Sequence, residues 1–113
     1  MRYPEDEETA MHPMLQEKLQ TLRELCVRHR VERLDLFGSA ARGDFDPRTS
    51  DLDFLVAFEP MSPVEHADSF FGLLEDLRHL FGRHVDLLEA EPIENPYLWS
   101  SIVRSRMALY EAA

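Results

Sequence analysis

Two short stretches, Gly-Ser-Ala-Ala-Arg-Gly at residues 38–43 and Ser-Asp-Leu-Asp-Phe-Leu at residues 50–55, decide the fold that this sequence favours. The first is a small-residue turn that follows an apolar segment, and the second opens another apolar segment. Side chains alternate faces along a strand, so Asp51 and Asp53 are predicted to project from one face, roughly 6.5–7 Å apart. Two carboxylates beside a glycine turn that phosphates can approach indicate a magnesium–nucleotide site.

On either side of these stretches, the sequence predicts alternating helices and strands. Apolar residues recur at helical spacing in three segments, and short apolar runs bounded by turn residues mark the strands. The predicted helices span about 12–30, 64–81 and 96–104, with a short helix starting in 38–43, and the predicted strands span 31–37, 51–58, 84–89 and 107–111. This order predicts an α/β (α+β) domain in which helices pack on a small mixed β-sheet.

Length and charge limit the classes of protein that fit. The 113 residues are expected to form one domain at 11–113 behind an acidic tail at 1–10. The formal charge of −10 argues against direct binding of nucleic acid, because phosphate contacts require basic side chains. No apolar run approaches the roughly 18 residues of a membrane span, so we expect no membrane association and a cytoplasmic location. The single cysteine, Cys26, falls on an apolar helical face and is predicted to be a core residue.

A third carboxylate, Asp86, completes the predicted site. It lies among apolar neighbours in the strand predicted at 84–89, where an unpaired carboxylate would be costly to bury. If that strand lies beside 51–58, Asp51, Asp53 and Asp86 converge, and three like charges favour a bound cation. In the turn, Gly38 lets the backbone approach phosphate oxygens, while Ser39 and Arg42 can donate hydrogen bonds to them.

These residues resemble the signature of the minimal nucleotidyltransferases of the DNA-polymerase-β-like superfamily. That signature is Gly-Ser, a spacer of about ten residues, Asp-x-Asp, and a third aspartate on a later strand. Here it corresponds to Gly38-Ser39, Asp51-x-Asp53 and Asp86, with a spacer of eleven residues between Ser39 and Asp51. The resemblance covers about residues 12–112 and implies the nucleotidyltransferase fold.

The resemblance also implies an activity. Stand-alone proteins of this kind are similar to antitoxins that transfer AMP from Mg-ATP to a tyrosine hydroxyl of a cognate HEPN ribonuclease toxin, which silences the toxin. By this analogy Gly38 and Ser39 hold the triphosphate, and Asp51 and Asp53 hold two magnesium ions. Asp86 holds the catalytic ion and helps to deprotonate the hydroxyl. The expected cofactors are therefore two Mg²⁺ ions with ATP as co-substrate, and the expected partner is the toxin.

Two other functions stay open on the sequence alone. One is a non-catalytic antitoxin that neutralises the toxin by binding, which the acidic composition also fits. The other, less favoured, is a transferase that modifies a small hydroxyl compound.

Several residues near the motif have uncertain positions on the sequence alone. Strand alternation favours a surface position for Asp35. His84 shares a strand face with Asp86, yet a solvent-facing or packed position is favoured over a contact with the site. Tyr97 and Trp99 fit a core position and a partner interface about equally well.

Overall fold

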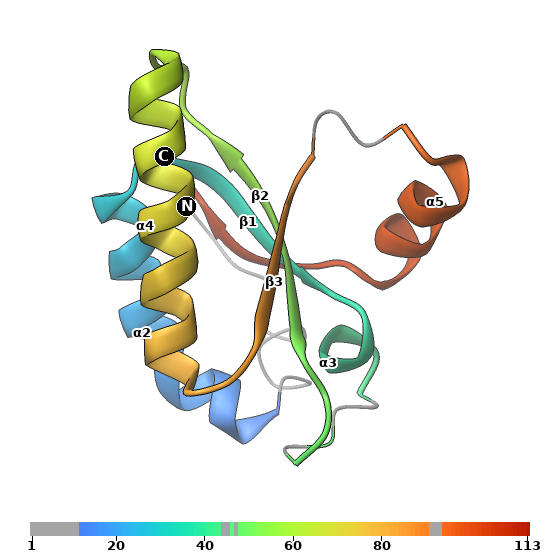
Figure 1. Ribbon diagram of the computed structural model, residues 1–113. Helices are drawn as coiled ribbons and strands as arrows, with labels where there is room; N and C mark the ends of the chain where they lie inside the picture. The colour runs from blue at the N-terminus through green and yellow to red at the C-terminus, as the bar shows by residue number, and fades with distance from the viewer. Residues whose placement is uncertain (1–11, 44–45, 47, 91–93) are drawn as a thin grey trace.

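The computed structural model describes residues 12–43, 46, 48–90 and 94–113, and the acidic tail expected at 1–10 lies outside this range. The described chain alternates helices with strands around one sheet (Figure 1). In chain order the elements are α2 (Pro13–Arg28), β1 (Val31–Phe37), α3 (Ser39–Arg42), β2 (Leu52–Phe58), α4 (Pro63–Phe81), β3 (Val85–Glu89), α5 (Pro96–Ser105) and β4 (Met107–Glu111). The predicted α/β architecture is confirmed.

The sheet is mixed and has the strand order β3-β2-β1-β4. β2 and β3 run parallel, whereas β1 is antiparallel to both β2 and β4. The parallel pair needs a crossover, which α4 supplies between the end of β2 and the start of β3. Because β2 and β3 are neighbours, the two strands that carry the predicted carboxylates lie side by side, which is the arrangement that the site requires.

One face of the sheet forms the main core with α2 and α4 (Figure 1). Apolar residues of the two central strands point into this core, and Leu34, Leu36, Phe54 and Val56 are almost fully buried. Cys26 on α2 is fully buried in the same cluster, as predicted. Burial raises the pKa of its thiol to about 12.

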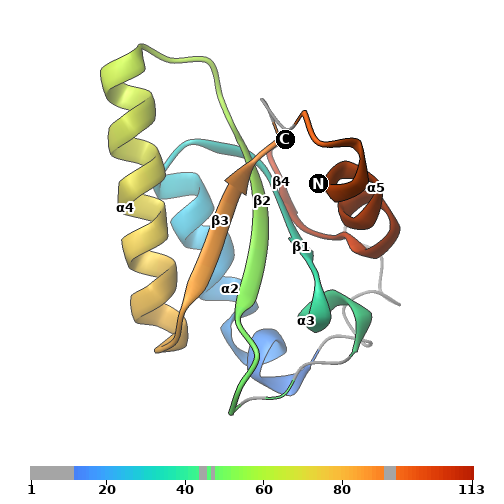
Figure 2. The same cartoon turned by 45° about the vertical axis from the view of Figure 1, so that its right-hand side comes forward.

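The opposite face of the sheet carries α5, and α3 lies at the end of β1 with Ala40 buried in the main core (Figure 2). A smaller cluster of Phe37, Leu55 and Ile102 attaches α5 to this face, and Ile102 is the buried residue of that helix. The face is otherwise open at the end where β2 and β3 begin, so polar groups there remain accessible. Among the helices of the described ranges, none is long and apolar enough to cross a membrane.

Candidate active site

Asp53 and Asp86 are direct neighbours across the parallel pair of strands. In the register of β2 and β3, Asp53 lies directly opposite Asp86. Both side chains project from the face of the sheet that carries α5, because the alternating residues Leu52, Phe54, Val85 and Leu87 fill the main core. Strand pairing therefore brings together two of the three carboxylates that the sequence singles out.

Asp51 reaches the same group from the residue just before β2. Its backbone is held by two contacts between neighbouring segments: the Leu52 amide donates to the His84 carbonyl at 3.4 Å, and Arg83 Nη1 donates to the Ser50 carbonyl at 3.1 Å. Asp51, His84 and Asp86 each offer one ligand atom, and these atoms lie within 4.8 Å of one another. All three residues are exposed, so a cation can reach them from solvent.

His84 is the residue of this cluster that the sequence did not assign to the site. Its Nε2 lies 2.9 Å from Asp86 Oδ1 while its side chain stays 54% exposed. The contact follows from the two-residue spacing of His84 and Asp86 at the start of one strand, which puts both side chains on one face. That spacing was the available signal, but only the pairing of β3 with β2 brings His84 close to Asp51.

Gly38 occupies a conformation that only glycine adopts readily. Its φ of 74° and ψ of −152° fall in a region almost closed to residues with a side chain. It follows Phe37, which is the register partner of Asp53, so the turn lies against the carboxylate. A Cβ on Gly38 would stand 2.4 Å from Asp53 Oδ2, a distance that no real contact allows. The backbone of the turn thus approaches Asp53 as closely as it does because residue 38 has no side chain.

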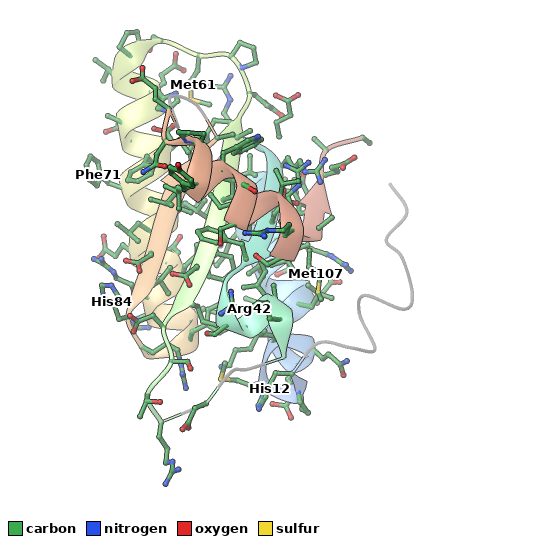
Figure 3. All side chains as sticks on the ribbon, turned by 90° about the vertical axis from the view of Figure 1, so that its right-hand side faces the viewer. His12, Arg42, Met61, Phe71, His84 and Met107 are labelled. Atoms are coloured by element: carbon green, nitrogen blue, oxygen red, sulfur yellow. The ribbon has the colours of Figure 1, made fainter. Side chains whose placement is uncertain are left out.

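The short helix α3 carries the other two predicted nucleotide-binding residues. Ser39 begins the helix, and the amides of Ala41 and Arg42 donate to the Gly38 carbonyl, each at 3.1 Å. Arg42 ends the helix with an exposed side chain, and its positive charge offsets a small part of the rise that burial causes in the pKa of Asp53. Figure 3 shows Arg42 and His84 toward the same end of the sheet. The turn and the carboxylates therefore lie toward the same end of the sheet.

The carboxyl group of Asp53 is harder to ionise than an ordinary aspartate. Partial burial is the main cause, followed by the hydrogen bond and negative charge of Asp86 and the negative charge of Asp51, and together they raise its pKa to about 6. A cation placed among these groups would remove the repulsion that raises the pKa. The carboxylate and imidazole donors present are ones that divalent cations accept in proteins. On this electrostatic evidence, the residues fit a bound divalent metal.

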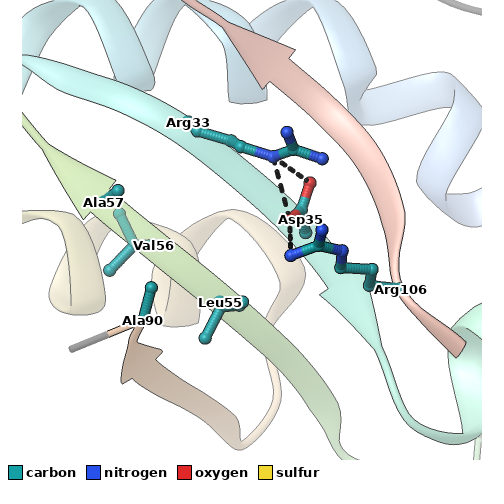
Figure 4. Close-up of a pocket in the computed structure, with 7 residues that line it drawn as sticks. All are labelled: Arg33, Asp35, Leu55, Val56, Ala57, Ala90 and Arg106. Atoms are coloured by element: carbon teal, nitrogen blue, oxygen red, sulfur yellow. Dashed lines mark hydrogen bonds and ion pairs between the residues drawn. The ribbon is translucent and has the colours of Figure 1, made fainter. Parts of the chain in front are cut away.

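Asp35 corrects one expectation, because it is buried rather than exposed. Only 1% of it is accessible, although strand alternation favoured the surface. Its two oxygens each lie 3.0 Å from Arg33 Nε, and Arg106 Nη1 lies 3.9 Å from Oδ2 (Figure 4). The arginine at the end of α5 covers this part of the sheet, which a pattern within β1 cannot reveal. The pocket beside Arg33, Asp35 and Arg106 has a volume of about 40 Å³, which is far too small for a nucleotide.

Comparison with known proteins identifies the family of the chain. The family described as "Nucleotidyltransferase domain" matches residues 18–109, and the chain therefore belongs to the nucleotidyltransferase family. Two proteins of Methanocaldococcus jannaschii, both named provisionally as protein adenylyltransferases, are similar in sequence. One is 35% identical over 75 residues, 66% of this chain and 73% of that protein. The other is 38% identical over 77 residues, 66% of this chain and 72% of that protein.

Solved structures confirm the fold. A structure described as a minimal nucleotidyltransferase superposes with a TM-score of 0.64 at 34% identity, over 82% of this chain and 90% of that one. A toxin–antitoxin complex with AMP-PNP gives a TM-score of 0.63 at 21% identity, over 83% of this chain and 73% of that one. A structure of a tri-AMPylated Shewanella oneidensis HEPN toxin in complex with MNT antitoxin gives a TM-score of 0.58 at 18% identity, over 86% of this chain and 72% of that one.

Proposed function

We propose that this chain is an antitoxin that transfers AMP from ATP to a tyrosine hydroxyl of a cognate HEPN ribonuclease toxin and thereby neutralises it. The observation that carries the proposal is the convergence of Asp51, Asp53 and Asp86 beside the Gly38 turn. The provisional names of the similar archaeal proteins support adenylyl transfer. The toxin–antitoxin structures of the same fold support a protein partner.

The residues divide into two groups in this proposal. The backbone at Gly38 and Ser39 and the guanidinium of Arg42 bind the triphosphate, since the turn approaches the carboxylates without a side chain between them. Asp51, Asp53 and Asp86 would hold two Mg²⁺ ions, with His84 oriented toward Asp86 at the edge of the group. When bound, Mg²⁺ supplies charge neutralisation at the reacting phosphate and at the pyrophosphate leaving group.

The transfer is a substitution at the α-phosphorus of ATP. The tyrosine oxygen forms the new bond to phosphorus, the bond from that phosphorus to the pyrophosphate oxygen breaks, and pyrophosphate leaves with the electron pair. The proton of the tyrosine hydroxyl passes to a carboxylate, for which Asp86 is the candidate because it is exposed at the edge of the cluster. Positioning and charge stabilisation supply most of the acceleration in such reactions.

The charge of the chain supports a protein partner over a nucleic acid. A formal charge of −10 repels a phosphate backbone and attracts a basic protein surface. A ribonuclease is expected to present such a surface where it binds RNA. Cytoplasmic location is part of the same proposal, since ATP, Mg²⁺ and an RNA-cleaving toxin are met together there.

The test is intact mass spectrometry of the HEPN-domain protein encoded beside this chain, after incubation with this chain, ATP and magnesium. We expect the mass of the toxin to rise by one or more AMP units, and Asp51→Asn to abolish the gain. Fragmentation of the labelled toxin should locate the AMP on tyrosine. Labelling that persists in Asp51→Asn, Asp53→Asn and Asp86→Asn would overturn the assignment of the site.

The same experiment distinguishes the alternative of a non-catalytic antitoxin. In that case the toxin keeps its mass, the two proteins still form a stable complex, and the three aspartate variants still protect cells that express the toxin. The exposed apolar side chains of α5 are compatible with such binding. Labelling of small hydroxyl compounds without a protein acceptor would instead indicate a small-molecule transferase.

A further inference from the structure

The helix α5 carries more exposed large hydrophobic residues than any other element of the described chain. Seven large hydrophobic residues are exposed among the described residues, and the ten-residue helix α5 contributes four of them. These four, which point in different directions around the part of the helix that Ile102 does not bury and which we together call the α5 face, are Tyr97 (85% exposed), Leu98 (39%), Trp99 (37%) and Val103 (46%). Tyrosine and tryptophan are the residues most enriched at the energetic centres of protein interfaces. A single helix that exposes both is typical of a contact surface.

The α5 face is held in place from beneath, so it does not need a partner to become ordered. Ile102 is fully buried against Phe37 and Leu55 and attaches the helix to the sheet. Asn95 caps its first turn by accepting from the Tyr97 and Leu98 amides at 2.9 and 3.2 Å. At the other end, the Arg106 guanidinium lies 5.7 Å from the centre of the Trp99 ring. The exposed residues thus stand on a rigid support.

The same helix is connected directly to the nucleotide turn. The Gly38 amide donates to Ser105 Oγ at 3.3 Å, so the last turn of α5 lies against the turn that the proposed function assigns to phosphate binding. Tyr97 is eight residues earlier, about 12 Å along the helix axis at 1.5 Å per residue. A protein that presents a hydroxyl at the carboxylates would therefore cover the α5 face within an interface of ordinary size, about 800 Å² per partner.

We propose that the α5 face is the docking surface for the protein that receives AMP, a partner that is basic around its acceptor hydroxyl. This inference rests on the proposed function. Charge favours this occupant over a second copy of the chain, because two copies that each carry −10 repel one another. A small-molecule acceptor would not extend over the helix. The open carboxylate cluster and the apolar α5 face are then two parts of one interface, the first binding the reacting groups and the second the partner.

The chain offers a matched control on the other side of the sheet. The double variant Tyr97→Ala/Val103→Ala removes one aromatic and one valine from the α5 face. The double variant Phe71→Ala/Val64→Ala likewise removes one aromatic side chain and one valine, but from α4, where Phe71 is 65% and Val64 is 72% exposed. In Figure 3 the α5 side faces the viewer, and Phe71 lies out on α4. None of the four side chains belongs to the core, so both variants should keep the wild-type melting temperature.

The experiment measures three quantities for wild type and both variants, with the neighbouring HEPN-domain toxin as the probe. These are the dissociation constant of the complex, the rate of AMP transfer against toxin concentration, and the binding of Mg-ATP without toxin. We expect the α5 variant to weaken the complex and raise KM about tenfold or more, with Mg-ATP binding unchanged. The α4 variant should stay within about twofold of wild type.

The outcomes separate the inference from the proposed function. If wild type binds the toxin without labelling it, and only the α5 variant loses binding, AMP transfer is wrong but the docking surface stands. If wild type labels the toxin and the α5 variant does so equally well, the docking surface is overturned and the activity stands. If wild type neither binds nor labels the toxin, both are overturned. A wild-type dimer that only the α5 variant dissociates would assign the face to a second copy instead.

Discussion

Gly38 and Asp53 lie so close together that a single added carbon at Gly38 would stand 2.4 Å from Asp53 Oδ2. The two residues come from different strands, and the register partner of Asp53 is Phe37, the last residue of β1. The turn at Gly38 and the carboxylate cluster are therefore adjacent because β1 and β2 pair. Any side chain at residue 38 would displace the Asp53 carboxylate.

Gly38→Ala should abolish transfer while the protein stays folded. The methyl group must displace Asp53, and the backbone conformation at this position is strained for alanine, so we expect a loss of stability of about 1–3 kcal/mol. We expect the rate of AMP transfer to fall at least about a hundredfold, because a displacement near 1 Å is costly in catalysis. Transfer rate and urea unfolding measure the two effects.

Gly43→Ala is the control for backbone strain. Gly43 also has a positive φ, 85°, but nothing lies within 4 Å of the position of its Cβ. It should lose about 1 kcal/mol and keep most of the transfer activity. Equal losses of activity in the two variants would mean that strain in the turn, and not the approach to Asp53, matters.

Asp53→Asn should stabilise the protein without metal at neutral pH. The pKa of Asp53 is raised to about 6 in the folded state, above its ordinary value of about 3.9. Folded protein thus holds this proton more tightly than unfolded chain, and the contribution of this group to stability falls as pH rises from about 4 to about 6. Asparagine does not titrate, so the Asp53→Asn variant does not lose this stability as the pH rises. After discounting for the exposure of the side chain, we expect a gain of about 1 kcal/mol at pH 7.5.

The gain in stability of Asp53→Asn is measured by comparing its melting temperature with that of wild type at two pH values. With a chelator present to remove metal ions, the melting temperature of Asp53→Asn should exceed that of wild type by a few degrees at pH 7.5 and by much less at pH 4.5. Asp68→Asn, on the exposed surface of α4, should change little at either pH. A variant less stable than wild type at pH 7.5 would contradict the repulsion inferred among the carboxylates.

Much of this site follows from the sequence, because its decisive patterns are local. The two-residue spacing of Asp51 and Asp53, the glycine turn and the apolar alternation of β2 each depend on neighbours along the chain. The strand itself begins at Leu52, so Asp51 lies just before it, a shift of one residue from the prediction. Ends of elements are set by contacts such as that of Arg83 with Ser50, which sequence periodicity does not contain.

The features that sequence reasoning missed depend on contacts between distant segments. Asp35 is buried because Arg106, some seventy residues later, closes over it, and alternation within β1 carries no information about that cover. His84 joins the carboxylates only through the pairing of β3 with β2. The exposure of Tyr97 likewise depends on which side of α5 faces the sheet, and Ile102 fixes that side.

Magnesium should stabilise the protein without nucleotide, and the effect should depend on pH. A cation relieves the repulsion among Asp51, Asp53 and Asp86, while protons compete for the same oxygens. At a concentration ten times the dissociation constant, we expect a gain of about 1.4 kcal/mol, seen as a few degrees in melting temperature at pH 7.5 and less at pH 5. Chelator should reverse the gain.

Variants assign the magnesium effect to the cluster. Asp86→Asn and Asp51→Asn should each remove most of the stabilisation by magnesium, and His84→Ala should reduce it less, because a hard cation prefers oxygen ligands. Asp68→Asn should keep the full effect. If the Asp86→Asn protein gained as much from magnesium as wild type, the cation would bind elsewhere.

The two arginines around Asp35 should contribute unequally to stability. Arg33 Nε lies 3.0 Å from both oxygens of a carboxylate that is 1% exposed, whereas Arg106 Nη1 is 3.9 Å from one of them. Arg33→Met therefore leaves a buried charge without its main partner, and we expect a cost of about 2–3 kcal/mol. Arg106→Met should cost about 1 kcal/mol or less. Urea unfolding of the two variants measures the difference, and equal costs would mean that Arg106 neutralises Asp35 as strongly as Arg33 does.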